Sequence, residues 1–270
     1  MDTKILFTDL DETLLRSDKT ISSQDLASIR AITEHGHKFV VATGRPLYSA
    51  YKLCREYDFV GPGFYIIASN GSVIYDCSTE SVIHRNSVPS EYVAHILDTV
   101  HEAGIHVHTY TDEHVVSRHE TKELKNYSSR IKMPYRVIPD LPHSLPYDPP
   151  KVIAISDLGR KVLVPLRDKL APWAEGKISM CFSLDTLLEF LPLNSSKGNG
   201  VKQLCELLGI PVSQAIACGD EENDISMIQV AGVGVAMQNS TDQVKIHADY
   251  VTHNTNNESA ITEVINNFIL

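Results

Sequence analysis

Three short runs of acidic and polar residues each follow an apolar stretch of strand length in this sequence. They are Asp9-Leu10-Asp11-Glu12-Thr13, Thr43-Gly44-Arg45 and Gly219-Asp220-Glu221-Glu222-Asn223-Asp224. Carboxylates that converge on one site repel one another unless a cation compensates their charge. A few hard oxygen ligands favour Mg²⁺, which keeps some of its waters and takes a phosphate oxygen as a further ligand. These residue types therefore indicate a site for phosphoryl transfer.

The apolar stretches before the three runs predict three buried strands, which are Lys4–Thr8, Phe39–Ala42 and Gln214–Cys218. The carboxyl ends of parallel strands meet at one edge of an open α/β sheet, and ligands bind at that edge. We therefore expect Asp9, Asp11, Thr43 and Asp220 to converge there. Lys197 opens a predicted helix just before the third strand and can join them.

The same edge offers groups that suit a phosphate. Lys197 brings a positive charge, and the hydroxyl of Thr43 brings a hydrogen-bond donor. Backbone N–H groups at Leu10 and Gly44 can donate to further phosphate oxygens. Each group is a weak signal alone, and together they predict a site that binds a transferring phosphoryl group.

The pattern of elements divides the chain into a core and an insert. Strand–helix units with continuous apolar strands recur in residues 1–82 and 193–270, which predicts an α/β core with a Rossmann-like parallel sheet covered on both faces. Residues 83–192 read as alternating strands and amphipathic helices, which predicts an inserted α+β domain with helices on one face of a mainly antiparallel sheet. A Pro-rich stretch, 134–150, is predicted to be a loop.

Composition excludes several classes of protein. The formal net charge of -10 argues against binding to nucleic acid, which requires clustered Lys and Arg. No apolar run approaches the roughly 18 to 20 residues of a membrane helix, and we expect no signal peptide, because Asp9 and Asp11 interrupt the early apolar stretch. Five cysteines without CxxC spacing indicate reduced, packed thiols. We expect a cytoplasmic enzyme.

The sequence resembles the haloacid dehalogenase superfamily, in the Cof-type phosphatase branch that carries an α/β (C2-type) cap as an insert. Five motifs carry the resemblance: DLDET at 9–13, ATGR at 42–45, SNG at 69–71, SKGNG at 196–200 and GDEENDISM at 219–227. They occur in the expected order over the whole chain, with an insert of the expected length between the SNG and SKGNG motifs. The resemblance implies a magnesium-dependent phosphatase whose insert selects the substrate.

The resemblance also implies roles for residues at matching positions. Asp9 is the nucleophile that forms an aspartyl-phosphate, and Asp11 is the general acid and later the general base. Mg²⁺ is held by Asp9, by the backbone carbonyl of Asp11 and by Asp220. The remaining assignments are Thr43 and Lys197 on the phosphoryl group, Asn223 on phosphate or a metal-bound water, and Asp224 as a support for the metal ligands.

Two positions depart from the family pattern. Glu12 replaces the glycine that is most common there, and the segment 257–259 lacks a glycine often found in that loop. The second departure leaves the shape of that loop open. The presence of Asp11 argues against dehalogenase chemistry, which needs neither a second aspartate nor a metal.

Several points stay open at the level of sequence. A sugar phosphomutase, or a phosphate-sensing binding protein without turnover, would share the same motifs. We expect the partner to be a small phosphorylated metabolite, such as a sugar phosphate, and the protein to be a monomer or weak homodimer. His106 and His108 share one face of a predicted strand; with no third ligand at a suitable spacing, they are expected at the surface or facing substrate.

Overall fold

The computed structural model describes residues 2–270, which divide into two compact units. The first, here called the core unit, contains residues 2–44, Ala50–His84 and Ser196–Leu270. The second, the insert unit, contains Arg45–Ser49 and Arg85–Ser195. Each unit has its own sheet and its own cluster of buried apolar side chains.

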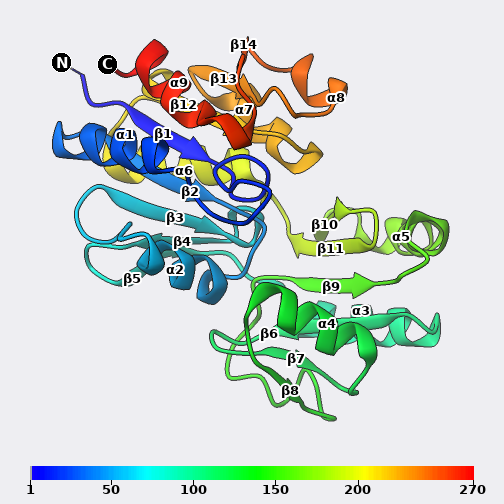
Figure 1. Ribbon diagram of the computed structural model, residues 1–270. Coiled ribbons are helices and arrows are strands. Elements are labelled where there is room, and N and C mark those ends of the chain that lie inside the picture. Colours follow the sequence, from blue (N-terminus) through cyan, green and yellow to red (C-terminus); the bar gives the residue numbers. More distant parts are fainter. Residues whose placement is uncertain (1) are drawn as a thin grey trace. The chain divides into compact units, whose positions relative to one another are not determined.

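The core unit is built on an eight-stranded sheet with the order β14-β13-β12-β1-β2-β3-β4-β5 (Figure 1). Neighbours from β14 to β3 are parallel, and β4 is antiparallel to β3. The strands are β1 (Ile5–Thr8), β2 (Lys38–Ala42), β3 (Phe64–Ala68), β4 (Val73–Asp76), β5 (Ser81–Arg85), β12 (Ala215–Gly219), β13 (Val233–Ala236) and β14 (Tyr250–Val251). The predicted Rossmann-like parallel sheet is confirmed, and β1, β2 and β12 lie side by side in it.

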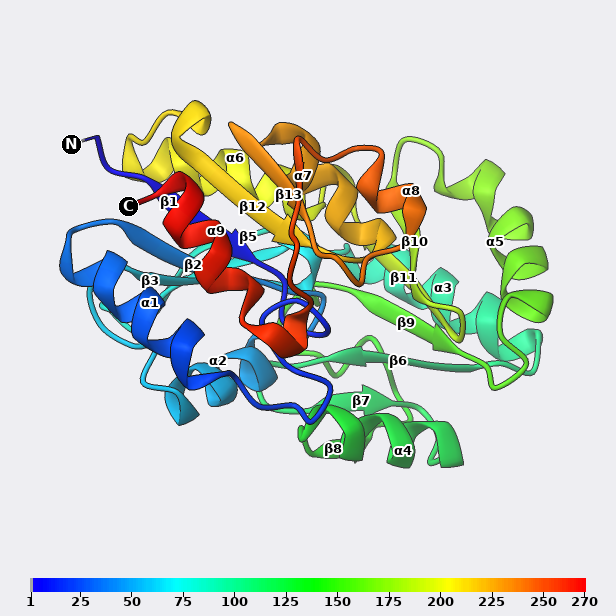
Figure 2. The same ribbon diagram turned by 45° about the horizontal axis from the view of Figure 1, so that its top comes forward.

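Helices cover both faces of this sheet, as a parallel sheet requires. Figure 2 shows α1, α2 and α9 on one side and α6 and α7 on the other. The helices of this part of the chain are α1 (Ser23–Glu34), α2 (Leu47–Glu56), α6 (Lys197–Leu208), α7 (Ile225–Val230), α8 (Asp242–Lys245) and α9 (Ala260–Phe268). Val201 and Leu204 of α6 belong to the same buried cluster as Ile5 and Phe7 of β1, so the helix that begins at Lys197 covers the face of the sheet to which these β1 side chains point.

Local sequence explains where α1 and α6 begin and end. The side chain of Ser22 accepts a hydrogen bond from the backbone N–H of Asp25 and caps α1, and Ser196 caps α6 in the same way through Asn199. Gly209 follows α6 in a left-handed conformation, which glycine adopts without a steric penalty. These short polar caps place Lys197 in the first turn of α6.

The insert unit contains a six-stranded sheet with the order β10-β11-β9-β6-β7-β8, in which only the β7–β8 pair is parallel. The strands are β6 (His106–Tyr110), β7 (Val115–Ser117), β8 (Tyr135–Val137), β9 (Val152–Ile155), β10 (Ile178–Leu184) and β11 (Leu187–Pro192). The helices are α3 (Ser90–Glu102), α4 (Lys122–Ile131) and α5 (Arg160–Ala174). The predicted α+β class with a mainly antiparallel sheet is confirmed.

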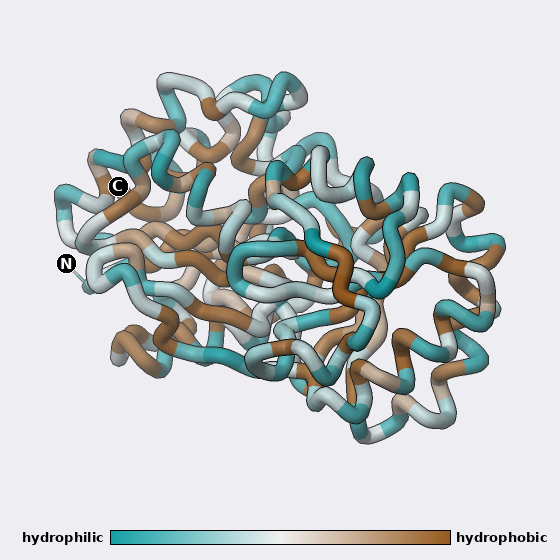
Figure 3. The backbone as a smooth tube through the Cα atoms, turned by 90° about the horizontal axis from the view of Figure 1, so that it is seen from below, coloured by the Kyte–Doolittle hydropathy of each residue, from teal (hydrophilic) through white to brown (hydrophobic). Residues whose placement is uncertain are grey.

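Two elements of the insert escaped the sequence-based prediction. α5 contains Pro165 and Pro172, which obscure the helical pattern because proline removes a backbone donor. β8 lies inside the Pro-rich stretch that was predicted to be a loop, and its three residues are too few to show a period. Hydrophobic and hydrophilic residues alternate along the helical coils of the tube in Figure 3, as expected for helices with one buried face.

The prediction that the helices of the insert gather on one face is wrong. Val152 and Ala154 of β9 pack in the cluster that contains α3 and α5, whereas Ile153 and Ile155 pack in the cluster that contains α4. Successive residues of a strand point to opposite faces, so α4 covers the face opposite to α3 and α5. Leu124 of α4 is fully buried in that contact.

The same packing overturns the expectation for His106 and His108, both of which are buried. Their side chains form a chain of hydrogen bonds: His106 Nε2 to His108 Nδ1 at 3.1 Å, His108 Nε2 to the hydroxyl of Tyr110 at 3.0 Å, and that hydroxyl to the hydroxyl of Tyr127 at 2.6 Å. The hydroxyl of Thr121 lies 2.8 Å from His106 Nδ1. Because α4 covers this face, the histidines are core residues and not surface groups.

Two general features of the described residues agree with the composition. All five cysteines are free thiols, and four of them are buried. Among residues 2–270, no helix combines the length and the apolar character that crossing a membrane requires.

Candidate active site

The first motif residue, Asp9, follows β1 directly and is largely buried. Its backbone N–H donates to the carbonyl of Cys218 in β12 at 3.0 Å, which extends the parallel pairing by one residue. Its own carbonyl accepts from the N–H of Leu14, and the carbonyl of Leu10 accepts from the N–H of Leu15 at 2.7 Å. These bonds close a tight turn after the strand and hold the Asp9 carboxylate at the sheet edge.

Lys197 lies beside Asp9, although 188 residues separate them in the chain. The ammonium group is fully buried and lies 2.5 Å from Asp9 Oδ1 and 2.5 Å from Asp224 Oδ1. A buried ammonium is stable only when carboxylates compensate its charge. The start of α6 therefore brings a fixed positive charge to the end of β1, as the sequence predicted.

Asp220 and Asp224 follow β12 and are held by the turn between them. The second carboxylate oxygen of Asp224 accepts hydrogen bonds from the N–H groups of Asp220 and Glu221, at 3.0 and 3.1 Å. A Cβ atom on Gly219 would lie 2.3 Å from the Cβ of Asp224, so this turn can close only on glycine. Thr13 donates its hydroxyl proton to Asp220 Oδ1 at 2.6 Å and joins the turn to the loop after β1.

Three buried carboxylates, those of Asp9, Asp220 and Asp224, form one cluster in the described part of the chain. One oxygen of each lies within 4.8 Å of the others, which is close enough for a single metal ion. Burial raises the pKa of Asp9 and of Asp220, and repulsion from neighbouring carboxylates raises both further. The single ammonium of Lys197 leaves negative charge uncompensated here, and a divalent cation fits that deficit.

The carboxylates of Asp9 and Asp224 affect the pKa of Lys197, and Lys197 in turn affects the pKa of Asp9. Burial lowers the pKa of Lys197, but the charges of Asp224 first and of Asp9 second outweigh it and raise the pKa above the usual range. Lys197 is therefore an ammonium whose main counter-charge is Asp224. Asp9 retains a raised pKa despite this ammonium, because burial is the larger effect on it.

A second group of motif residues surrounds Asn70, in the turn η1 (Ser69–Gly71) after β3. The backbone N–H of Asn70 donates to the carbonyl of Thr43 at 3.1 Å, and its side-chain oxygen accepts from Asn223 Nδ2 at 3.1 Å. A Cβ on Gly44 would lie 3.2 Å from the same side-chain oxygen. Asn70 therefore fixes Thr43, Gly44 and Asn223 relative to one another.

The remaining motif residues occupy distinct places. The side chain of Leu10 is fully buried in the core, so only its backbone can serve the site. The carboxylate of Asp11 is 44% exposed and lies beside Lys19. Sequence reasoning gave no site role to Asn70, Thr13 or Lys19. Asn70 and Thr13 belong to motifs that the sequence shows. Their side-chain partners, Asn223 and Asp220, lie more than 150 residues away in the chain, so the sequence did not reveal these contacts.

Comparisons with known proteins decide the family. A family model described as haloacid dehalogenase-like hydrolase matches residues 6–265. The chain belongs to the haloacid dehalogenase-like hydrolases. The crystal structure of a haloacid dehalogenase-like hydrolase from Bacteroides thetaiotaomicron superposes with a TM-score of 0.90 and 30% identity, covering 98% of this chain and 99% of that one.

Curated relatives of this hydrolase are phosphatases. The 5-amino-6-(5-phospho-D-ribitylamino)uracil phosphatase YitU of Bacillus subtilis is 28% identical, over 99% of each chain. The pyridoxal phosphate phosphatase YbhA of Escherichia coli is 25% identical, over 96% of each chain. The predicted resemblance to the Cof-type branch is confirmed, and this hydrolase is a phosphoric monoester hydrolase.

Proposed function

We propose that this hydrolase is a magnesium-dependent phosphatase that cleaves a small phosphorylated metabolite, such as a sugar phosphate, through an aspartyl-phosphate on Asp9. The observation that carries the proposal is the buried group at the sheet edge, in which Asp9 lies beside Lys197 and two further carboxylates. The phosphatase names of its relatives support the reaction class. Their substrates differ from one another, so the substrate proposed here is a class and not a compound.

In the first half of the reaction, a carboxylate oxygen of Asp9 attacks phosphorus. The Asp9–phosphorus bond forms while the bond from phosphorus to the leaving oxygen breaks, and Asp11 gives its proton to that oxygen. In the second half, Asp11 takes a proton from water, whose oxygen attacks phosphorus. The Asp9–phosphorus bond then breaks, and inorganic phosphate leaves with Asp9 restored.

The other motif residues bind the phosphoryl group and hold the site together. Lys197 neutralises charge on the transferring group, the Thr43 hydroxyl donates to it, and the N–H groups of Leu10 and Gly44 add donors. Asn223 contacts the phosphate or a water near it. Asp224 holds Lys197 and the backbone of Asp220, so it acts through its neighbours.

The donor set fits Mg²⁺, because buried carboxylate oxygens are hard ligands that a small divalent ion prefers. Asp9, Asp220 and the backbone carbonyl of Asp11 would hold it. Bound there, the ion would offset negative charge on the carboxylates and on the phosphoryl oxygens. Residues 83–192, inserted between the core segments 1–82 and 193–270, act in this proposal as the domain that selects the leaving group.

The decisive experiment measures inorganic phosphate released from a panel of phosphorylated metabolites, with Mg²⁺ and with chelator. Asp9→Asn should lower turnover at least about 10⁴-fold, because it removes the nucleophile, and should leave the thermal unfolding midpoint within a few degrees. Asp58→Asn, an exposed aspartate that follows α2, is the matched control and should retain full activity. Retained turnover in Asp9→Asn would refute the nucleophile.

The same assay separates the alternatives left open by the sequence. A phosphomutase returns the phosphoryl group to a sugar and releases little inorganic phosphate. A binding protein without turnover releases none with any substrate of the panel. Release of phosphate that stops when Mg²⁺ is chelated supports the proposed hydrolysis.

A further inference from the structure

The turn at residues 16–20, which follows the first motif, places Lys19 beside that motif. The backbone N–H of Arg16 donates to the carbonyl of Thr20, and the N–H of Lys19 donates to the carbonyl of Arg16, both at 2.8 Å. Asp18 accepts from the N–H and the hydroxyl of Thr20, at 3.0 and 2.6 Å. Lys19 has a φ of 65°, in the left-handed region. The backbone of Lys19 is therefore fixed by the turn and not by its side chain.

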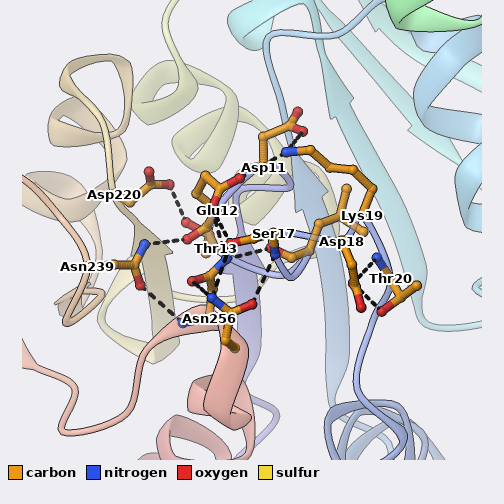
Figure 4. Close-up of polar contacts among 12 residues, drawn as sticks. Asp11, Glu12, Thr13, Ser17, Asp18, Lys19, Thr20, Asp220, Asn239 and Asn256 are labelled. Atoms are coloured by element: carbon orange, nitrogen blue, oxygen red, sulfur yellow. Dashed lines mark hydrogen bonds and ion pairs between the residues drawn. The ribbon is translucent and has the colours of Figure 1, made fainter.

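The ammonium of Lys19 lies between two carboxylates of the first motif. It is 3.4 Å from Asp11 Oδ1 and 2.9 Å from Glu12 Oε1, and Figure 4 shows the side chain reaching back to this motif. Exposed ion pairs of this kind contribute only about 0.2–1 kcal/mol to stability. The side chains of Lys19, Asp11 and Glu12 are 54%, 44% and 43% exposed, so stability does not explain the arrangement.

Glu12 is anchored independently of Lys19. Its second carboxylate oxygen accepts from Asn256 Nδ2 and from the Ser17 hydroxyl, both at 3.2 Å. Its backbone carbonyl accepts from Asn239 Nδ2 at 2.8 Å. Asn256 is buried and also donates to the carbonyl of Leu15 at 2.9 Å. Figure 4 shows these contacts converging on Glu12 from the chain around Asn239 and Asn256.

Glu12 adopts a φ of 58°, a conformation that glycine accepts freely and other residues accept at a cost of about 1 kcal/mol or more. A glutamate here bears the strain and in return offers a carboxylate to Lys19. That carboxylate accepts a hydrogen bond from Lys19 at 2.9 Å.

From these contacts we propose that Lys19, held by Glu12, is a positioning residue for Asp11. This inference rests on the proposed role of Asp11 as the acid that protonates the leaving oxygen. Lys19 lies within ion-pair distance of both carboxylates, and Glu12 holds its ammonium in place, so the pair restricts where the Asp11 carboxyl group lies. Displacement of a reacting group by about 1 Å can lower a rate by about 10²-fold.

The test uses two substrates that differ in their need for the acid. p-Nitrophenyl phosphate releases a stable phenolate that needs little protonation, whereas phenyl phosphate releases a poorer leaving group that does. The quantity to compare is kcat/KM with Mg²⁺ present, because it reports the steps up to departure of the leaving group. Lys19→Met should lower kcat/KM for phenyl phosphate about 10-fold and for p-nitrophenyl phosphate less than about 2-fold.

Two further variants complete the test. Lys19→Arg keeps the positive charge and should restore most of the loss on phenyl phosphate. Arg30→Met is the matched control, because Arg30 lies outside the insert, is 53% exposed and pairs with an exposed carboxylate, that of Asp58. This variant should leave kcat/KM unchanged for both substrates.

Each result decides the proposal. A selective loss on phenyl phosphate supports it, whereas an equal loss on both substrates, or no loss, overturns it while leaving the proposed phosphatase intact. If the unsubstituted protein shows no magnesium-dependent release of phosphate from either compound, the proposed function fails and this inference fails with it.

Discussion

At the scale of single residues, the two departures from the family pattern share one property. Glu12 and Ser259 both adopt a left-handed backbone conformation, with φ of 58° and 62°. In each case the polar side chain has a distant partner: Glu12 bonds to Asn256, and Ser259 lies 2.8 Å from the hydroxyl of Ser22. Such contacts offset the backbone strain at both positions.

The buried carboxylates of the site should destabilise the metal-free protein. Burial raises the pKa of Asp220 to about 8, so at pH 7 the folded core bears the cost of keeping this group protonated. Asp220→Asn removes that cost, and its amide oxygen can still accept from Thr13, so the free energy of unfolding in chelator at pH 7 should rise by about 1–2 kcal/mol. The dependence of phosphate release on Mg²⁺ should be lost with the activity. Urea denaturation and a magnesium titration measure the two effects.

A matched control for this variant is Asp58→Asn, which removes a charge from a side chain that is 77% exposed. It should change neither the free energy of unfolding nor the magnesium dependence. A destabilised Asp220→Asn protein would show that the carboxylate contributes more through its hydrogen bond than it loses by repulsion.

At the scale of elements, the turn η1 joins three segments that carry proposed phosphate-binding residues: one follows β2, one opens α6 and one follows β12. Asn70 contacts Thr43 and Asn223, and Gly71 packs against the backbone of Ser196, which caps α6. The position of Lys197 therefore depends on a turn that lies more than 120 residues earlier in the chain. The SNG motif is thus a structural support of the site.

Gly71→Ala should be strongly destabilising. The new Cβ would lie 2.1 Å from the carbonyl oxygen of Ser196, at a φ of 93°. Backbone strain and overlap together should lower the free energy of unfolding by at least about 2 kcal/mol, and kcat/KM should fall because the start of α6 must move. Chemical denaturation and steady-state kinetics measure both effects.

Gly61→Ala is a control that introduces backbone strain without steric overlap. Gly61 has a similar φ of 88°, but nothing lies within 4 Å of an added Cβ. It should cost only about 1 kcal/mol and leave kcat/KM unchanged. Equal effects of the two substitutions would mean that the contact with Ser196 does not matter.

At the scale of the whole molecule, the two units should respond to pH in opposite directions when metal is absent. The raised pKa values of Asp9 and Asp220 mean that the folded core binds protons more tightly than the unfolded chain. Its stability should therefore fall as pH rises above about 4, the ordinary range of an aspartate. Each such group contributes up to about 1.4 kcal/mol per pH unit.

The stability of the insert unit should change with pH in the opposite direction, falling as pH falls. Burial lowers the pKa of His106 to about 4, against the opposing charge of Glu123, and that of His108 lies well below its usual range. The unfolded chain then binds protons that the folded unit excludes, so this stability is complete above about pH 6.5 and is lost as pH falls toward 4.

Amide hydrogen exchange in chelator, expressed as protection factors at pH 5.5 and pH 8, tests both directions. Protection of β6 and β9 should be higher at pH 8, and protection of β1 and β12 should be higher at pH 5.5. His106→Gln should weaken the response of the insert alone, because His108 keeps its lowered pKa. A parallel response of both units would contradict the assignment of these groups.

The sequence by itself determined the fold class and the set of residues at the sheet edge. Asp9, Thr43 and Asp220 each follow a strand of the parallel sheet, and parallel strands align their carboxyl ends whatever the loops do. Neighbouring residues also determine where α6 begins and ends, because Ser196 and Gly209 cap it. Patterns of this kind depend only on neighbouring residues, so they can be read without a structure.

Only the tertiary structure decided which distant side chains meet. It showed that Asp224 is a second partner of Lys197, that Asn256 holds Glu12 from 244 residues away, and that α4 buries His106 and His108. Such contacts depend on loop conformations and on which layer covers a strand face, and neither leaves a period in the local sequence. The support of the site was therefore visible only in three dimensions.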